Sequence, residues 1–225
     1  MKEIKRLRAI ADLINVGDNI AADIGCDHGI LSKMLIDEHR AIKIIATDIS
    51  KQSLQKTIDL VEKNNLQEKI ETRVGDGFEP IKNEKIDFAI IAGMGGYEII
   101  KIMECKNVKI KKFILQPSKN QNVVELRRYL NKNGYYIERD FITLDRKRFY
   151  NTIECYKSKQ KQNLTFEDTE FGLTNFDLYS DDFKLYVQEY IKKKEEVINK
   201  CSEKNEFKNQ LSQAKKILES FNKKK

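Results

Sequence analysis

The chain has 225 residues, of which 40% are apolar and 34% charged, and its formal net charge is +7. This length fits one large domain, or one medium domain with an appendage, and the apolar fraction is enough for a buried core. No apolar stretch is long enough for a transmembrane helix or a signal peptide, so we expect a cytoplasmic protein without membrane contact.

The cysteines and histidines exclude two kinds of site. The four cysteines lie far apart, no Cys-x-x-Cys pair exists, and the only histidines are His28 and His39. This spacing predicts no metal site and no disulfide framework, and it favours reduced thiols. The positive net charge is typical of proteins with a polyanionic partner, although nucleotide bias in a genome would produce the same excess of lysine.

The first 17 residues combine basic and apolar positions. The apolar ones are spaced by three and four, which predicts an amphipathic helix; they are Ile4, Leu7, Ile10, Ala11 and Ile14. Such a helix could simply cover one end of a sheet. Alternatively, its basic residues Lys5, Arg6 and Arg8 could contact phosphate.

From Asn19 onward, apolar strand patterns alternate with helical ones. The expected strands are Ile20–Ile24, Ile42–Thr47, Ile70–Val74, Ile86–Ala92, Lys112–Gln116, Tyr135–Leu144 and Arg148–Lys157. The expected helices are Gly29–Asp37, Lys51–Asn64, Gly95–Met103 and Val123–Asn133. This alternation predicts an α/β, Rossmann-like fold with a mostly parallel sheet, and the closing hairpin makes the last strand antiparallel.

The composition changes after Ser158, which divides the chain into domains 1–160 and 161–225. Lys159–Asp168 is polar and predicts a linker. Two helical series follow, separated by a bend at Ser202–Glu206, and they predict a coiled-coil-like hairpin. The series are Phe183, Val187, Tyr190, Lys194, Val197 and Cys201, then Phe207, Leu211, Ala214, Leu218 and Phe221.

The predicted hairpin carries most of the excess positive charge. From residue 183 onward there are twelve lysines and six glutamates. The hairpin could be a dimerisation element with a solvated face, or an arm that grips RNA. The oligomeric state stays open, with a monomer as the default expectation.

The segment from Ala21 to Gly29 is a glycine-bearing turn between a strand and a helix. Such turns bring a ligand close to the backbone and to a helix N-terminus. A dinucleotide-binding turn has three glycines, whereas this one keeps Gly25 and Gly29 and places Asp27 and His28 between them. Carboxylates in so tight a turn suit a cationic ligand better than a pyrophosphate, which indicates a sulfonium cofactor, S-adenosylmethionine.

Three further loops lie at predicted carboxyl ends of strands, where ligands bind in open α/β sheets. Asp48, with Ile49 beside it, follows the second strand, 23 positions beyond Gly25, and suits ribose hydroxyls. Gly75-Asp76-Gly77 follows the third strand and could bind an adenine edge. Ala92-Gly93-Met94-Gly95-Gly96 follows the fourth. Each loop alone has an ordinary structural explanation, such as a helix cap or a tight turn, but their order and spacing favour a nucleoside-bearing cofactor over NAD.

The motifs resemble those of the TrmK family, bacterial tRNA methyltransferases that act on N1 of adenine 22. The resemblance covers essentially the full length, including the basic helical extension. It rests on Ala22-Asp23-Ile24-Gly25-Cys26-Asp27-His28, Gly75-Asp76-Gly77, Ile91-Ala92-Gly93-Met94-Gly95-Gly96 and Leu115-Gln116-Pro117. Cys26 stands where we expect a small residue such as serine.

The resemblance implies S-adenosylmethionine as cofactor and tRNA as substrate. The expected cofactor residues are Asp23, Gly25, Asp27, His28, Asp48, Ile49, Asp76, Gly77, Gly93 and Met94. Asp27 and Met94 are the expected catalytic residues. Alternatively, Asp27 orients the cofactor or the loop without a catalytic role, and His28 caps the loop without contacting a ligand. The expected tRNA contacts are Lys5, Arg6, Arg8, Gln116, Pro117, Lys119, Arg146, Arg148 and Tyr150.

Other functions remain open from sequence alone. The chain could methylate another RNA base or a small molecule, or it could be a silent RNA-binding module that keeps the fold. The basic hairpin disfavours a small substrate, and the intact loops with Asp23, Gly25, Asp48 and Asp76 disfavour a silent module.

Overall fold

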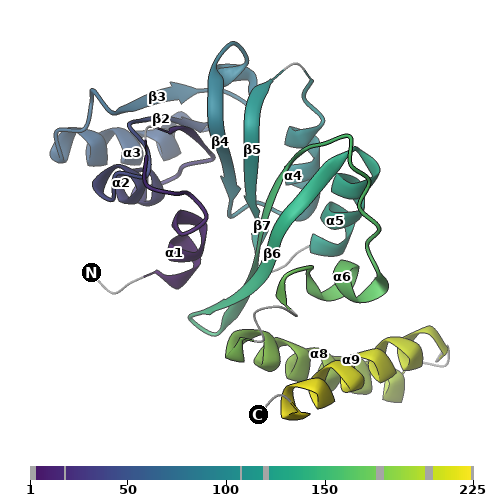
Figure 1. The fold of residues 1–225 in the computed structure, drawn as a ribbon. Coiled ribbons are helices and arrows are strands. Elements are labelled where there is room, and N and C mark those ends of the chain that lie inside the picture. Colours follow the sequence, from purple (N-terminus) through teal and green to yellow (C-terminus); the bar gives the residue numbers. More distant parts are fainter. Residues whose placement is uncertain are drawn as a thin grey trace.

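The computed structural model describes residues 4–17, 19–106, 108–118, 122–175, 180–200 and 205–223. Seven strands form one sheet in the order β3-β2-β1-β4-β5-β7-β6 (Figure 1). Their bounds are β1 Ile20–Ile24, β2 Lys43–Asp48, β3 Ile70–Val74, β4 Lys85–Ala92, β5 Lys109–Gln116, β6 Tyr135–Asp145 and β7 Arg148–Lys157. Strands β1 to β5 pair in parallel, and β7 pairs antiparallel with both β5 and β6.

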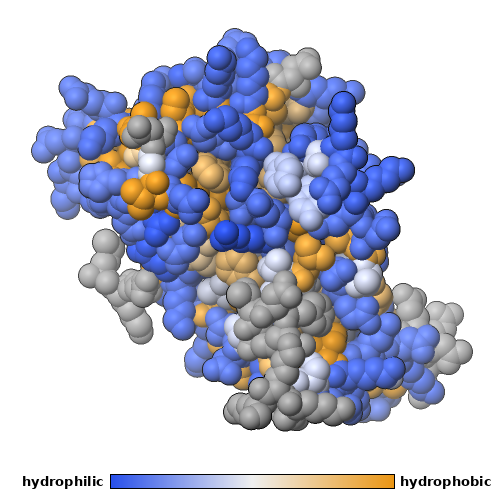
Figure 2. All heavy atoms as spheres, viewed as in Figure 1, coloured by the Kyte–Doolittle hydropathy of each residue, from blue (hydrophilic) through white to orange (hydrophobic). Residues whose placement is uncertain are grey.

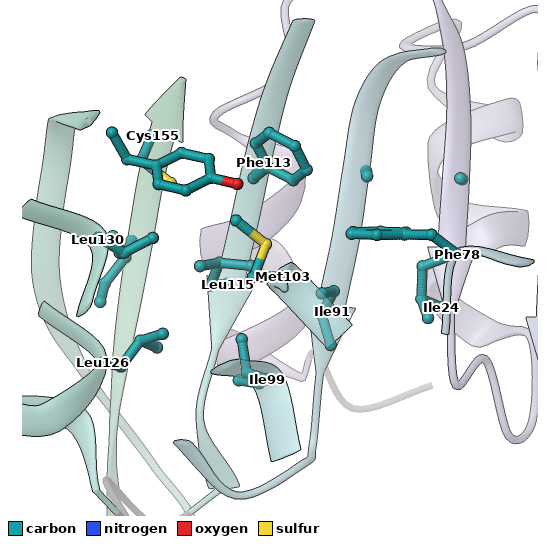
Figure 3. Close-up of a cluster of buried hydrophobic side chains, with 14 of the residues drawn as sticks. Ile24, Phe78, Ile91, Ile99, Met103, Phe113, Leu115, Leu126, Leu130 and Cys155 are labelled. Carbon is teal, nitrogen blue, oxygen red and sulfur yellow. The ribbon is translucent and has the colours of Figure 1, made fainter. Parts of the chain in front are cut away.

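The helices in the described residues are α1 Lys5–Ala11, α2 Ile30–Asp37, α3 Lys51–Lys63, the 3₁₀ turn η1 Glu79–Ile81, α4 Gly96–Met103, α5 Val123–Lys132, α6 Phe166–Phe171, α8 Asp181–Lys200 and α9 Asn205–Lys223. Those from α1 to α5 cover both faces of the sheet. One core packs α1, α2 and α3 against residues such as Ala21, Ile44 and Ile90. The other packs α4 and α5 against the opposite face, and Figure 3 shows Met103, Leu126 and Leu130 converging there.

The apolar side chains of β1 and β4 explain why helices cover both faces of the sheet. Successive side chains point to opposite faces of a strand, and ten of the thirteen residues of β1 and β4 are apolar, as expected for a parallel sheet buried on both sides. The Rossmann-like fold class predicted from sequence is therefore confirmed. On the outer surface shown in Figure 2, hydrophilic residues dominate and apolar ones lie in separate small areas.

The N-terminal helix is shorter than predicted. It begins at Lys5 and ends at Ala11. After this end, Leu13 N donates a hydrogen bond to Ile10 O, and Ile14 N donates one to Ala11 O. Leu13 and Ile14 remain buried, so the apolar spacing was informative about burial beyond the end of the helix.

The predicted linker contains a helix that the sequence prediction missed. Helix α6 begins after Thr165, whose hydroxyl accepts from Asp168 N while the Asp168 carboxylate accepts from Thr165 N. This capping box is readable in the sequence and would have found the helix. The α6 end of the linker is therefore ordered structure packed against α5 and β6.

The C-terminal helices α8 and α9 pack against each other, and α8 also packs against β6 of the β6–β7 hairpin (Figure 1). Phe183, Val187, Ala214 and Phe221 are buried in this contact, whereas Val197 is 39% exposed. The predicted bend at Ser202–Glu206 and the Cys201 position fall mostly or wholly outside the described residues. The helix pair predicted from the two apolar series is therefore present, and it is buried at the end of α8 that contains Phe183 but not at Val197.

Candidate functional site

The predicted cofactor loops meet at the carboxyl ends of β1 to β4. Strand β1 ends at Ile24 and its loop turns at once, because Gly25 N and Cys26 N both donate to Thr47 O. Gly25 has a φ of +74° and Gly29 a φ of +65°, a left-handed conformation that favours glycine. Helix α2 then starts directly after Gly29.

Two adjoining hollows lie above these loops. The first, which we call the β1 hollow, has a volume of about 280 Å³ and is lined by Arg6, Asp23, Gly25, Asp27, His28, Asp48, Gly93 and Met94 together with apolar residues of α1 and α2. The second, the β3 hollow, is about 300 Å³ and is lined by Gly25, Thr47, Asp48, Ile49, Gly75, Asp76, Gly77 and Met94 together with Glu98, Lys101 and Ile102 of α4. The structure thus brings together all ten residues predicted to bind the cofactor.

Met94 lies at the junction of the two hollows. Gly25, Asp48 and Met94 line both, and a Cβ placed on Gly25 would lie only 2.2 Å from Met94 Cε. The backbone of Met94 is held because its carbonyl accepts from Ser118 N over 2.8 Å. An elongated ligand that spans both hollows would therefore run past Gly25 and contact the flexible Met94 side chain.

Asp23 is the buried carboxylate of the β1 hollow. It is 4% exposed, and Ser32 Oγ donates to its Oδ2 over 2.7 Å. Burial raises the pKa of Asp23 to about 6, and the negative charge of Asp48 adds to the rise. A cation bound beside Asp23 would favour the ionised form, so this group is suited to a positively charged ligand.

Asp27 and His28 lie on the exposed side of the same turn. His28 Nδ1 lies 2.6 Å from Asp27 Oδ2, and Lys56 Nζ donates to Asp27 Oδ1 over 2.9 Å. Burial acts to raise the pKa of Asp27, but the contacts with Lys56 and His28 outweigh it, so the pKa is below its ordinary value. Asp27 is therefore an ionised carboxylate. Sequence analysis did not identify its partner Lys56, whose position on α3 depends on the fold.

The thiol of Cys26 is not suited to act as a nucleophile. Its Sγ lies 3.3 Å from Thr57 Oγ1 in the core, and burial raises the pKa of the thiol to about 12. The thiolate needed for nucleophilic attack is thus disfavoured at neutral pH.

Arg6 lines the β1 hollow, and it contacts Gln116, at the end of β5, and Tyr150. The Arg6 guanidinium lies 5.7 Å from the centre of the Tyr150 ring, and its Nη1 makes a long hydrogen bond of 3.5 Å to Gln116 Oε1. The Gln116 amide is buried and already donates to Arg6 O and Thr152 Oγ1. Arg6 and Tyr150 are therefore the more accessible members of this group, and the tRNA contacts predicted for all three stay predictions.

The other predicted tRNA contacts lie elsewhere. Lys5 and Arg8 line a groove of about 780 Å³ between α1 and β6. Arg8 forms a bidentate pair with Glu38, whose Oε1 and Oε2 lie 2.5 and 2.7 Å from the guanidinium nitrogens, so contact with phosphate would have to compete with that pair. Pro117 is buried after β5, Arg146 and Arg148 are exposed on the β6–β7 hairpin, and Lys119 falls outside the described residues.

No cluster of three or more His, Cys, Asp or Glu side chains suited to a metal ion occurs among the described residues. In the same part of the chain, no helix is long and apolar enough to cross a membrane.

Comparison with known proteins decides the family. The model of the TrmK family, described as tRNA (adenine(22)-N(1))-methyltransferase, matches residues 21–223. The chain belongs to this family. Membership confirms the activity predicted from sequence, methyl transfer from S-adenosylmethionine to N1 of adenine 22 in tRNA.

Individual TrmK relatives agree with this assignment. A proposed tRNA methyltransferase of Mycoplasma genitalium is 34% identical over 177 residues, which are 76% of this chain and 79% of that protein. The tRNA (adenine(22)-N(1))-methyltransferase of Bacillus subtilis is 38% identical over 138 residues, covering 60% and 57%. The solved structure of M. capricolum TrmK with S-adenosyl-homocysteine superposes with a TM-score of 0.83 at 28% identity, covering 95% of this chain and 96% of that one. The predicted cofactor is thereby confirmed as well.

Proposed function

We propose that this TrmK chain carries out its reaction with the methionine part of S-adenosylmethionine in the β1 hollow and the adenosine part in the β3 hollow. The observation that carries the proposal is the junction at Met94 and Gly25, where two hollows of similar size meet and share the Asp48 carboxylate. Asp48 suits the ribose hydroxyls, and the 68% exposed side chain of Ile49 offers an apolar surface to the adenine. The residues present therefore fit the cofactor.

The reaction needs alignment more than proton transfer. When bound, S-adenosylmethionine supplies an electrophilic methyl group on its sulfonium sulfur. Adenine N1 has an in-plane lone pair at neutral pH, so no general base has to act first. The chain contributes by holding N1, the methyl carbon and the sulfur in line, and by placing carboxylates near the purine as it becomes cationic.

The target adenine enters from the rim formed by Arg6, Met94 and Tyr150. Because the base lies within folded tRNA, it must leave its stack to reach the methyl group. The Tyr150 ring and the Arg6 guanidinium, which face each other at this rim, are flat groups against which a base can stack. The exposed Gly93 allows close approach of the base to the backbone.

Asp27 is the proposed electrostatic residue at the reacting edge. We expect Asp27→Asn to lower kcat by roughly tenfold to 100-fold with little change in the dissociation constant for tRNA, because the amide keeps the shape but not the charge. Asparagine also tolerates the φ of +45° found at Asp27, so the turn is retained. Single-turnover methylation and tRNA binding measure the two effects. A variant with near-normal turnover would leave Asp27 as a residue that shapes the loop.

The C-terminal helices complete the proposed tRNA surface. Exposed lysines on α8 and α9 supply a positive surface, and the chain is proposed to act as a cytoplasmic monomer that uses residues from both predicted domains. The division into domains 1–160 and 161–225 stays a proposal, in which α6, although it packs against α5, belongs to the second domain.

A labelled-methyl assay on total tRNA tests this function. The wild-type chain should transfer label from S-adenosylmethionine to tRNA and create a reverse-transcription stop, because a methyl group on N1 blocks Watson–Crick pairing. Binding of tRNA without transfer would support the silent RNA-binding module instead.

A further inference from the structure

A third hollow lies where the turn between β6 and β7 meets α8, and we call it the hairpin hollow. Its volume is about 300 Å³. Three aromatic rings form its walls, those of Phe149, Tyr186 and Tyr190, and three cations stand on its rim, Lys147, Arg148 and Lys193. It shares no lining residue with the β1 hollow or the β3 hollow.

The aromatic walls are fixed in place by packing. The rings of Phe149 and Tyr186 meet edge to face with centroids 5.3 Å apart. Tyr190 meets the fully buried Phe171 in the same way at 4.9 Å, and its hydroxyl donates to Glu170 over 3.2 Å. All three wall rings stay partly exposed, so they present preformed apolar faces to the hollow.

The rim is more positive than negative. Lys147 and Arg148 are exposed, and neither takes part in an ion pair within the described part of the chain. Lys193 pairs with Glu189, the one carboxylate that lines the hollow. Three cations against one carboxylate favour an anionic ligand.

Strand β7 connects the hairpin hollow to the proposed active site. Phe149 is in its wall, and the next residue, Tyr150, lies against Arg6 at the rim of the β1 hollow. Successive side chains of a strand point to opposite faces, so the two sites lie on either side of the same hairpin. A tRNA that occupies both sites would therefore reach around the edge of this hairpin.

We propose that the hairpin hollow binds one unpaired nucleotide of the tRNA, with its base against the aromatic walls and its phosphate against the rim cations. Aromatic faces combined with cations are the usual means by which proteins hold single-stranded RNA. The proposal rests on the proposed function, because it takes tRNA as the substrate. It adds a second contact that fixes the tRNA beside the residue to be methylated.

Paired lysine substitutions test the rim. In Lys147→Gln/Lys193→Gln we expect tRNA binding about tenfold weaker at moderate salt, and a slope of log K against log salt reduced by about 1, because the two lysines contact one phosphate. The matched control is Lys85→Gln/Lys109→Gln, which removes two exposed lysines at the amino ends of β4 and β5. The control should bind tRNA like the wild type, and all three proteins should bind S-adenosylmethionine equally.

Photo-crosslinking tests the walls. Ultraviolet irradiation of the wild-type complex with tRNA should attach RNA to a peptide containing Tyr186 or Tyr190. Crosslinks that avoid this peptide overturn the base contact, and a double variant that binds like its control overturns the phosphate contact. If the wild type methylates tRNA while either result is obtained, the nucleotide site proposed in the hairpin hollow is wrong and the proposed function stands. If the wild type transfers no methyl to tRNA, the proposed function itself fails.

Discussion

Replacing Gly25 with alanine is expected to weaken the binding of S-adenosylmethionine by about 100-fold or more. The added Cβ would lie 2.2 Å from Met94 Cε, at the point where the β1 hollow meets the β3 hollow. It would displace the Met94 side chain into the space that the cofactor needs. In addition, the φ of +74° at Gly25 costs a non-glycine residue about 1–2 kcal/mol. Calorimetric titration with S-adenosylmethionine measures the change.

Gly134→Ala provides a matched control for the backbone strain. Gly134 has a φ of +71°, and a Cβ there would meet only Ser158 O at 3.7 Å, between α5 and β6 and away from both cofactor hollows. Both variants should lose similar stability, but only Gly25→Ala should lose the cofactor. Equal cofactor affinity in the two variants would contradict the assignment of the two hollows.

Replacing Arg127 with leucine is expected to lower the free energy of unfolding by about 3–5 kcal/mol, because it leaves a buried carboxylate without its partner. Arg127 and Asp140 are 0% and 1% exposed, and their bidentate contacts measure 2.6 and 2.9 Å. Burial acts to lower the pKa of Arg127, but Asp140 outweighs it and raises the pKa. Arg127 Nη1 also donates to Thr169 O at the end of α6, so the variant would loosen the link from α5 to that helix.

The neighbouring Arg128→Leu makes the same chemical change at an exposed position of α5. It should alter the unfolding free energy by no more than about 0.5 kcal/mol. Urea unfolding of both variants gives the comparison. A loss in Arg127→Leu as small as in Arg128→Leu would show that the buried pair adds little to stability.

The sequence was most informative where the chemistry is local. Strand ends followed by glycine or aspartate identified the four cofactor loops, because parallel strands bring their carboxyl ends to one edge. Contacts between distant segments were not readable in this way. The pairing of Arg8 with Glu38 joins α1 to the residue after α2, and Arg127 meets Asp140 across the α5–β6 connection, so both depend on the finished fold.

Lys194 illustrates a position that sequence analysis could locate but not explain. It interrupts the apolar series of α8, where a charged residue is unfavourable in a helix pair. In the structure, its Nζ donates to Gln210 over 2.6 Å and lies 4.9 Å from the centre of the Phe207 ring. The charge is thus accommodated by a hydrogen bond and a ring face of α9, two partners that no spacing along α8 could indicate.

The most direct test of the proposed function compares two tRNA transcripts that differ only at position 22. With labelled S-adenosylmethionine, the wild-type chain should methylate the transcript with adenine at this position and give a reverse-transcription stop there. The transcript with guanine at position 22 should gain no label. Equal labelling of both transcripts, or label without a stop at position 22, would contradict methylation of N1 of adenine 22 by this chain.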